Sequence, residues 1–235
     1  MQLKFLSIFV KLGFGVLLVS SKLFAFAQPA GLLYDPEPPI DSAYVRVIHA
    51  AREGMVDVVV DGRIRLKKLA YAESSEYMVL AGGKHTMAIH ASGKPTPYFS
   101  TVFEVVKGRA VSLAFTTFRV GTEPIFFEDK ANTNKLKALL SVYNLDSKVG
   151  PVDILTTDGA TKVFEGLAYA TSASLLVNPI AIDLIAAKIG DKVPQGRMSL
   201  AMTQGGTYSV LLLPGDSGKL IVRTALNKIE RYTTK

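Results

Sequence analysis

The chain is built from two copies of one unit, because its sequence repeats itself at a nearly constant distance. Four stretches recur in the same order, each displaced by 95 to 98 positions. The pairs are "AYVRVIHA" (43–50) with "ALLSVYNL" (138–145), "VDVVVDG" (56–62) with "VDILTTDG" (152–159), "LAYA" (69–72) with "LAYA" (167–170), and "KGRAVSLAF" (107–115) with "GGTYSVLLL" (205–213). A slow drift over four separate stretches indicates an internal duplication. A unit of about 97 residues is domain-sized and too long for a solenoid repeat, so we predict two similar domains.

Short alternating runs predict that both domains are β-sandwiches. In "RAVSLAFTTF", Val111, Leu113 and Phe115 share one face of an extended strand, with polar or small residues opposite. In "AYVRVIHA", Val45 and Val47 oppose Arg46 in the same way. This period of two is typical of a half-buried strand. Gly-rich turns separate the runs, so we expect an all-β fold of two tandem, internally duplicated β-sandwiches with about seven strands each.

The repeat and the chain ends set the expected domain boundaries. We predict a signal peptide at 1–27, an extended Pro-rich arm at 28–41, a first β-sandwich at 42–128, a linker at 129–136 and a second β-sandwich at 137–235. We predict residues 180–187 as a strand, because the counterpart segment of the first repeat is strand-like. The tyrosines of the two "LAYA" segments, Tyr71 and Tyr169, are interpreted as buried packing residues.

The first 27 residues have the three parts of a secretory signal: positive charge at Lys4 and Lys11, an apolar stretch at 12–19, and Ala-Phe-Ala before Gln28. Lysines interrupt the apolar run, which is too short to span a membrane. We therefore expect an exported protein with no transmembrane segment in the mature chain.

Composition narrows the possible chemistry. The chain has no cysteine and three histidines, which excludes thiol nucleophiles, iron–sulfur clusters and most zinc sites. After residue 27 there are 24 basic and 20 acidic residues, and the excess lies in the second half, with 13 basic and 9 acidic residues. No arginine-rich stripe interleaved with aromatic residues accompanies this charge, so no nucleic acid partner is expected. The excess of basic residues would also allow a weak attraction of the protein to an anionic polymer.

One string looks catalytic, namely "GDSGK" at 215–219. It resembles serine-hydrolase nucleophile motifs, but no histidine follows it, and it lies between two strand-like runs where a hairpin turn is needed. We interpret it as a turn and predict no catalytic residue, metal or cofactor, and hence no enzyme. An esterase or acetyltransferase that uses Ser217 is the alternative. His49, and the pair His85 and His90, do not have metal-site spacing, and the aspartates at 57, 61, 153 and 158 are interpreted as turn-capping residues.

The segment "GLLYDPEPPIDSAYVRVIHA" at 31–50 resembles the start of the mature AlgF family of alginate O-acetylation proteins. The residues that carry the resemblance are Leu33, Tyr34, Pro36, Pro39, Ser42, Ala43, Tyr44, Val45, Arg46 and Val47. The second repeat extends it through "KALLSVYNLDSK", "TTDGATKV", "VNPIAIDL", "GDKV" and "GGTYSVLLLPG". The single repeats also resemble a broader group of exported β-sandwich domains.

The resemblance implies a non-catalytic periplasmic accessory protein for O-acetylation of an exopolysaccharide, alginate or a related polymer. Its implied partners are a membrane-bound O-acyltransferase and periplasmic SGNH-like acetyltransferases, which it would connect as an adaptor. An anionic polysaccharide is a further candidate partner. We expect Tyr34 and Pro36 in the arm as partner contacts, since a Pro-rich extended segment loses little entropy on docking. The alternative function is an exported polysaccharide-binding or cell-surface module.

Overall fold

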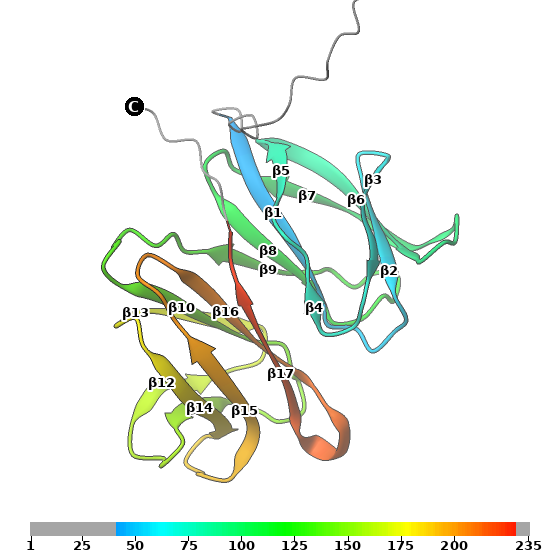
Figure 1. Cartoon of the computed structure of the whole chain (residues 1–235). Coiled ribbons are helices and arrows are strands. Elements are labelled where there is room, and N and C mark those ends of the chain that lie inside the picture. The colour runs from blue at the N-terminus through cyan, green and yellow to red at the C-terminus, as the bar shows by residue number, and fades with distance from the viewer. Residues whose placement is uncertain (1–40, 229–235) are drawn as a thin grey trace, which may run out of the picture. The chain divides into compact units, whose positions relative to one another are not determined.

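The computed structural model describes residues 41–228, which fall within one compact unit (Figure 1). Within this range the regular structure is β-strand, apart from a short 3-10 turn at Asp216–Gly218. The predicted signal peptide and nearly all of the predicted arm lie outside the described residues, and so do Tyr34 and Pro36. The all-β fold predicted from the alternating pattern is confirmed.

The first repeat forms two sheets. Its strands are β1 Ser42–His49, β2 Val56–Val60, β3 Arg63–Leu69, β4 Glu73–Ser74, β5 Met78–Ala81, β6 Gly83–Ala91, β7 Pro97–Val105, β8 Ala110–Phe115 and β9 Ile125–Asp129. Sheet 1A has the order β4-β1-β8-β9, with β5 also paired to β1, and sheet 1B has the order β3-β2-β6-β7. Strands β1 and β8 run parallel, and all the other pairs are antiparallel.

The second repeat has the same topology. Its strands are β10 Ala138–Asn144, β11 Val152–Thr156, β12 Lys162–Leu167, β13 Thr171–Val177, β14 Ala181–Lys188, β15 Pro194–Ala201, β16 Thr207–Pro214 and β17 Leu220–Leu226. Sheet 2A has the order β13-β10-β16-β17, and sheet 2B has the order β12-β11-β14-β15. The single strand β13 takes the place of β4 and β5, and β10 runs parallel to β16 as β1 does to β8. Strand β14 confirms the strand predicted at 180–187.

The expectation of seven strands per repeat was too low, since the described residues form nine in the first repeat and eight in the second. The extra strands include short or charged pieces at the sheet edges. The two-residue strand β4 is too short to show a hydrophobic alternation, so the period-two pattern does not reveal it.

Each sandwich has its own apolar core between its two sheets. In the first, Val45, Val47 and Leu113 of sheet 1A face Val58 and Ile89 of sheet 1B, all almost fully buried. The second core is built in the same way, with Leu140, Val142 and Val210 of sheet 2A facing Ile154 and Leu184 of sheet 2B. Burying these alternate side chains is the main favourable contribution to folding each unit.

The alternation predicted half-buried central strands in sheets 1A and 2A, but these strands are buried on both faces. Every residue of β1, β8 and β10 is buried, and Arg46 on the predicted solvent face is only 1% exposed. The reason is that the outer faces of these two sheets pack on each other. A period of two shows which side chains share a face, but it does not show what covers that face.

The connection between the repeats is held against the second sandwich. Asp129, which the sequence placed at the start of the linker, is instead the buried last residue of β9. After it, the Asn132 side-chain amide donates hydrogen bonds to the carbonyls of Lys137, at 3.0 Å, and Gly206, at 3.1 Å. These two bonds tie the polar segment to the start of β10 and to the turn before β16.

Candidate functional site

An apolar cluster joins the two sandwiches. It is made by the outer faces of sheets 1A and 2A and by the loops that follow β1, β3 and β10. Its buried members are Ile48, Ala50, Ala72, Ala114, Phe127, Tyr143, Leu145, Leu211 and Leu213. The Phe127 and Tyr143 rings meet edge to face at 5.2 Å between centroids. This third cluster makes the two repeats one packed body.

The contacts across the interface are reciprocal. The Tyr71 hydroxyl of the first repeat donates a hydrogen bond to the Pro214 carbonyl of the second. The Tyr169 hydroxyl of the second lies 3.2 Å from the Thr116 hydroxyl of the first. Tyr71 and Tyr169 are 98 residues apart, and so are Thr116 and Pro214. The two bonds are therefore one contact made twice, as across a two-fold axis.

The interpretation of both tyrosines as buried packing residues is confirmed for the packing of Tyr71, but neither side chain is buried. Tyr169 is 39% exposed, and Tyr71 is partly buried at the border of the interface cluster. The Tyr71 ring packs against the apolar cluster, and the hydroxyl groups of both tyrosines reach the opposite sandwich. A tyrosine suits this role because it has an apolar ring and a polar tip.

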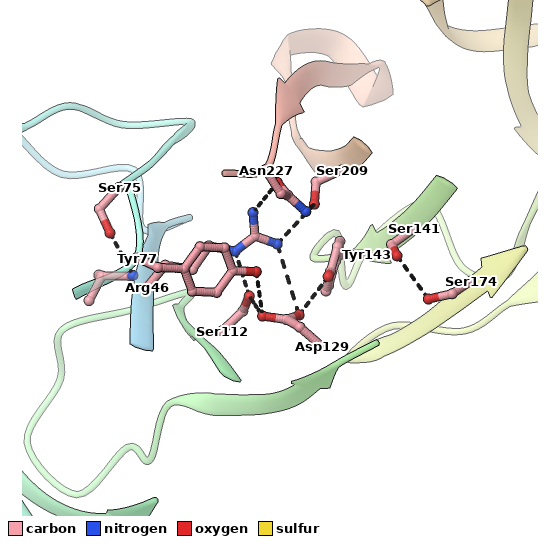
Figure 2. Close-up of polar contacts among 11 residues, drawn as sticks. Arg46, Ser75, Tyr77, Ser112, Asp129, Ser141, Tyr143, Ser174, Ser209 and Asn227 are labelled. Atoms are coloured by element: carbon pink, nitrogen blue, oxygen red, sulfur yellow. Dashed lines mark hydrogen bonds and ion pairs between the residues drawn. The ribbon is translucent and has the colours of Figure 1, made fainter. Parts of the chain in front are cut away.

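A buried arginine, Arg46, bridges the two repeats (Figure 2). The Arg46 Nε donates to Ser112 Oγ at 2.6 Å within the first repeat. Its other two nitrogens cross to the second repeat: Nη1 donates to Asn227 Oδ1 at 2.8 Å and Nη2 to Ser209 Oγ at 2.9 Å. Because burial of a guanidinium is costly without hydrogen-bond partners, this fan of acceptors is what allows Arg46 to be buried.

The Asp129 carboxylate supplies the negative charge next to this guanidinium. Its Oδ1 lies 3.9 Å from Arg46 Nη2, and it accepts hydrogen bonds from Ser112 at 2.6 Å, Tyr77 at 2.8 Å and Tyr143 at 2.6 Å. Burial raises the pKa of both phenols far above their ordinary value, so both stay protonated and donate. The Arg46 guanidinium also lies over the Tyr77 and Tyr143 rings, at 5.0 and 5.3 Å from their centroids.

The register of the sheets shows which residues of this network are equivalent. Arg46 pairs with Ser112 across β1 and β8, as Ser141 pairs with Ser209 across β10 and β16. Ser141 therefore stands where the first repeat has Arg46, and its hydroxyl instead contacts Ser174 at 2.8 Å (Figure 2). One guanidinium already bonds both equivalent serines, Ser112 and Ser209. A second arginine at position 141 would compete for the same two serine acceptors, which is a physical reason for the asymmetry.

A small cavity of about 150 Å³ opens beside the network. It is lined by Arg46 and by two segments from different repeats, the β4–β5 connection and the end of β17; the lining residues are Arg46, Ser74, Ser75, Glu76, Tyr77, Ala225, Leu226, Asn227 and Lys228. Ser75 Oγ in the same connection accepts from the Val47 amide at 3.0 Å. The network is thus reached from one edge of the interface.

The "GDSGK" string forms the turn between β16 and β17. The Gly215 amide donates to the Lys219 carbonyl at 3.0 Å, and the Lys219 amide donates to the Asp216 carbonyl at 3.1 Å. Ser217 sits exposed at the tip with φ of 56°, in the left-handed region. The neighbouring Asp216 carboxylate pairs with Arg52 of the first repeat. The described geometry is that of a hairpin turn which contacts the other sandwich.

The histidines and the repeated aspartates form hydrogen bonds within the sandwich to which they belong. His49 is buried with Nε2 2.9 Å from the Gly54 carbonyl, and His85 Nδ1 lies 2.7 Å from Asp61. Asp57 accepts from the Lys68 and Gly93 amides, at 2.8 and 3.0 Å. Its counterpart Asp153 accepts from the Gly166 amide at 2.8 Å. Hydrogen bonds from Gly93 and Lys68 lower the pKa of Asp57, so that carboxylate stays charged as an acceptor for the backbone.

Residues 41–228 contain no cluster of three or more His, Cys, Asp or Glu side chains with the geometry of a metal site. That part of the chain also contains no helix long and apolar enough to cross a membrane.

The Arg46 network was missed by the sequence reasoning. The strand alternation predicts a solvent-facing Arg46, and its partners Ser209 and Asn227 lie in the other repeat. The available signal was apolar: "TYSVLLLP" places Leu211 and Leu213 on the face opposite the core residues Val210 and Leu212. A central strand that is apolar on both faces indicates that both faces are covered.

The chain is similar to one family model and to several known proteins. The family model described as "Domain of unknown function (DUF4397)" matches residues 43–155, from β1 into β11. The alginate biosynthesis protein AlgF of Pseudomonas putida is 28% identical over 207 residues, which cover 88% of this chain and 87% of that protein. AlgF of Pseudomonas aeruginosa is 29% identical over 202 residues, which cover 83% and 84%.

Among solved structures, the C-terminal domain of AlgF from P. aeruginosa aligns with 24% identity and a TM-score of 0.34, covering 40% of this chain and 100% of that one. A third sequence relative, AlgF of Azotobacter vinelandii, is 25% identical over 173 residues, 74% of this chain and 73% of that protein. By these matches over most of its length, the chain is an AlgF-like protein.

Proposed function

We propose that this protein is a non-catalytic, periplasmic accessory protein in the biosynthesis of alginate or a related exopolysaccharide. The similarity to proteins named for alginate biosynthesis, over most of both chains, supports the pathway. Within it, we propose the role of an adaptor for O-acetylation, which connects a membrane-bound O-acyltransferase with periplasmic SGNH-like acetyltransferases.

The observation that supports the adaptor role is the packed interface between the two sandwiches. An adaptor must present two binding surfaces in a fixed relation, since a flexible pair would pay an ordering cost each time both partners bind. The Arg46 network and the apolar cluster supply that fixed relation. Because sheets 1A and 2A cover each other, the outer face of sheet 1B and the loops of both repeats stay available for partners.

The test of the proposal is the acetyl content of the exported polymer. A strain without this protein should make polymer that lacks acetyl groups, and the wild-type gene should restore them. Complementation by the Ser217→Ala variant should restore acetylation equally well. Equal acetylation with and without the protein would refute the pathway role. Loss of acetylation by a folded Ser217→Ala protein would instead support the esterase or acetyltransferase alternative.

The adaptor role needs a separate readout, namely capture of the acetylation enzymes by the tagged protein from periplasmic extracts and detergent-solubilised membranes. We propose Tyr34 and Pro36 as contacts for a partner, so replacing both by alanine should reduce capture of at least one enzyme. The matched control replaces Pro38 and Pro39 of the same arm by alanine. Equal capture by both variants and the wild type would remove the arm contact from the proposal.

A further inference from the structure

Strand β3 places four basic side chains on one free edge of the first sandwich. The strand reads "RIRLKKL", and Arg63, Arg65, Lys67 and Lys68 are all exposed. Among residues 41–228 it pairs only with β2, so its other side is the edge of sheet 1B. The first half of the chain has balanced charge, 11 residues of each sign between 28 and 128. The net charge of residues 28–128 is therefore zero, although positive charge is concentrated on this strand.

These basic side chains are not used to hold the described fold together. None of the four belongs to an ion pair within the described residues. The nearby carboxylates are already engaged: Asp57 accepts bonds from two backbone amides and from Ser92, and Asp61 lies against His85. Lys67 and Arg65 therefore interact with the Asp57 and Asp61 carboxylates only by longer-range electrostatic attraction.

A surface hollow of about 480 Å³ lies against the end of this strand. It is lined by Asp57, Ile64, Lys67, Lys68, Ser92, Gly93, Lys94 and Pro95. Lys94 comes from the turn between β6 and β7, so cationic side chains enter from two separate elements. Two register shifts along the β2–β3 pair mark bulges, which re-aim side chains at a sheet edge. The hollow thus combines three lysines with apolar contact from Ile64 and Pro95.

The duplication provides an internal comparison. The equivalent edge strand of the second repeat, β12, reads "KVFEGL". Its single lysine, Lys162, is paired with Asp153 at 3.2 Å and Glu165 at 2.7 Å. The same topology therefore forms without a row of unpaired cations. Basic residues do protect sheet edges from pairing with other strands, but this need is the same at both edges.

We propose that the cationic surface formed by Arg63, Arg65, Lys67, Lys68 and Lys94 binds the carboxylates of a polyuronate, a linear polysaccharide with a carboxylate on its sugar units. This inference rests on the proposed function, because the pathway supplies the polymer. A strand presents its charges in a row, which matches a linear polyanion better than a compact anion. Each exposed contact is weak and screened by salt, so affinity comes from several contacts made together. Ile64 and Pro95 offer apolar surface to the carbon face of a sugar ring.

The test measures binding of the purified protein to a sodium alginate oligomer by calorimetry at low and high salt. Neutral dextran serves as the uncharged control. The charge-reversal variant Lys67→Glu/Lys68→Glu/Lys94→Glu should weaken binding by about tenfold or more, and raised salt should do the same to the wild type. The matched control is Lys188→Glu/Lys192→Glu/Lys219→Glu, three exposed lysines of the second repeat, which should bind within about threefold of the wild type.

Three results would overturn the proposal. The wild type does not bind alginate, or both triple variants lose affinity equally, which would indicate net charge alone, or the protein binds vesicles containing phosphatidylglycerol but not alginate. Circular dichroism and urea unfolding would first confirm that both variants are folded. The polymer acetylation assay separates this inference from the proposed function, because acetylation that depends on the protein despite absent alginate binding would refute only the cationic surface.

Discussion

The Tyr71 hydroxyl donates a hydrogen bond to the Pro214 carbonyl, and 98 residues later Tyr169 contacts Thr116, the counterpart of Pro214. This reciprocity explains why "LAYA" occurs twice. The segment follows the third strand of each repeat and brings its tyrosine to the opposite sandwich. An isologous contact of this kind is typical of two-fold dimers, and here both halves of the contact belong to one chain.

Replacing Tyr71 by phenylalanine should lower the free energy of unfolding by about 1 kcal/mol, because the variant keeps the ring but loses one partly buried hydrogen bond. Urea unfolding of the full chain measures this change. Tyr169→Phe is the matched control. Its hydroxyl is more exposed and its contact is longer, at 3.2 Å, so its effect should be smaller. A larger loss from Tyr169→Phe than from Tyr71→Phe would contradict this ranking.

Replacing Arg46 by methionine should cost about 3–5 kcal/mol, because it removes one partner of a buried charge network and leaves Asp129 buried without its cation. The result should appear in urea unfolding, together with a more extended particle in small-angle scattering as the sandwiches separate. Arg52→Met is the control, since that arginine is half exposed and pairs with the exposed Asp216, and it should change little. Equal stability of the Arg46→Met variant and the wild type would show that the network does not join the sandwiches.

The duplication, the strands and the two sandwich cores could be predicted from the sequence, because each depends on local periodicity or on similarity between segments. The interface could not be predicted in the same way. Arg46 obeys the strand alternation, and arginine is seldom buried without partners, so it looks solvent-facing until Ser209 and Asn227 are known to lie beside it. Those partners are 163 and 181 residues away in the sequence. The edge strand β4 could not be predicted because a strand of two residues is too short to show an alternation of apolar and polar residues.

His49 should make the protein less stable below about pH 6.5. Burial lowers the pKa of this side chain from its ordinary value of 6.5, although the bond to Gly54 opposes the shift. Between the two pKa values the unfolded chain binds a proton that the folded chain does not. The stability contribution is therefore fully present above pH 6.5 and is lost as the pH falls toward the folded pKa.

The variant His49→Asn should lose this part of the pH dependence, since the equivalent position of the second repeat holds Asn144, which binds the Leu167 carbonyl at 2.9 Å. Urea unfolding between pH 7 and 5 gives the slope for both proteins. His85 acts in the opposite direction above pH 6.5: although burial lowers its pKa, the bond to Asp61 raises it overall. Identical slopes below pH 6.5 for wild type and variant would contradict the assignment to His49.

Ser217→Gly distinguishes the turn from a nucleophile more sharply than an alanine replacement. Ser217 has φ of 56°, a conformation that costs a non-glycine residue about 1–2 kcal/mol, partly offset in glycine by chain entropy. The variant should thus keep its stability or gain up to about 1 kcal/mol, and polymer acetylation should stay unchanged. Gly215→Ala is the opposing control, because its Cβ would clash with the Lys219 carbonyl oxygen and the turn would have to shift. A stable Ser217→Gly protein that no longer supports acetylation would mean that the hydroxyl takes part in chemistry, since the fold itself does not need it.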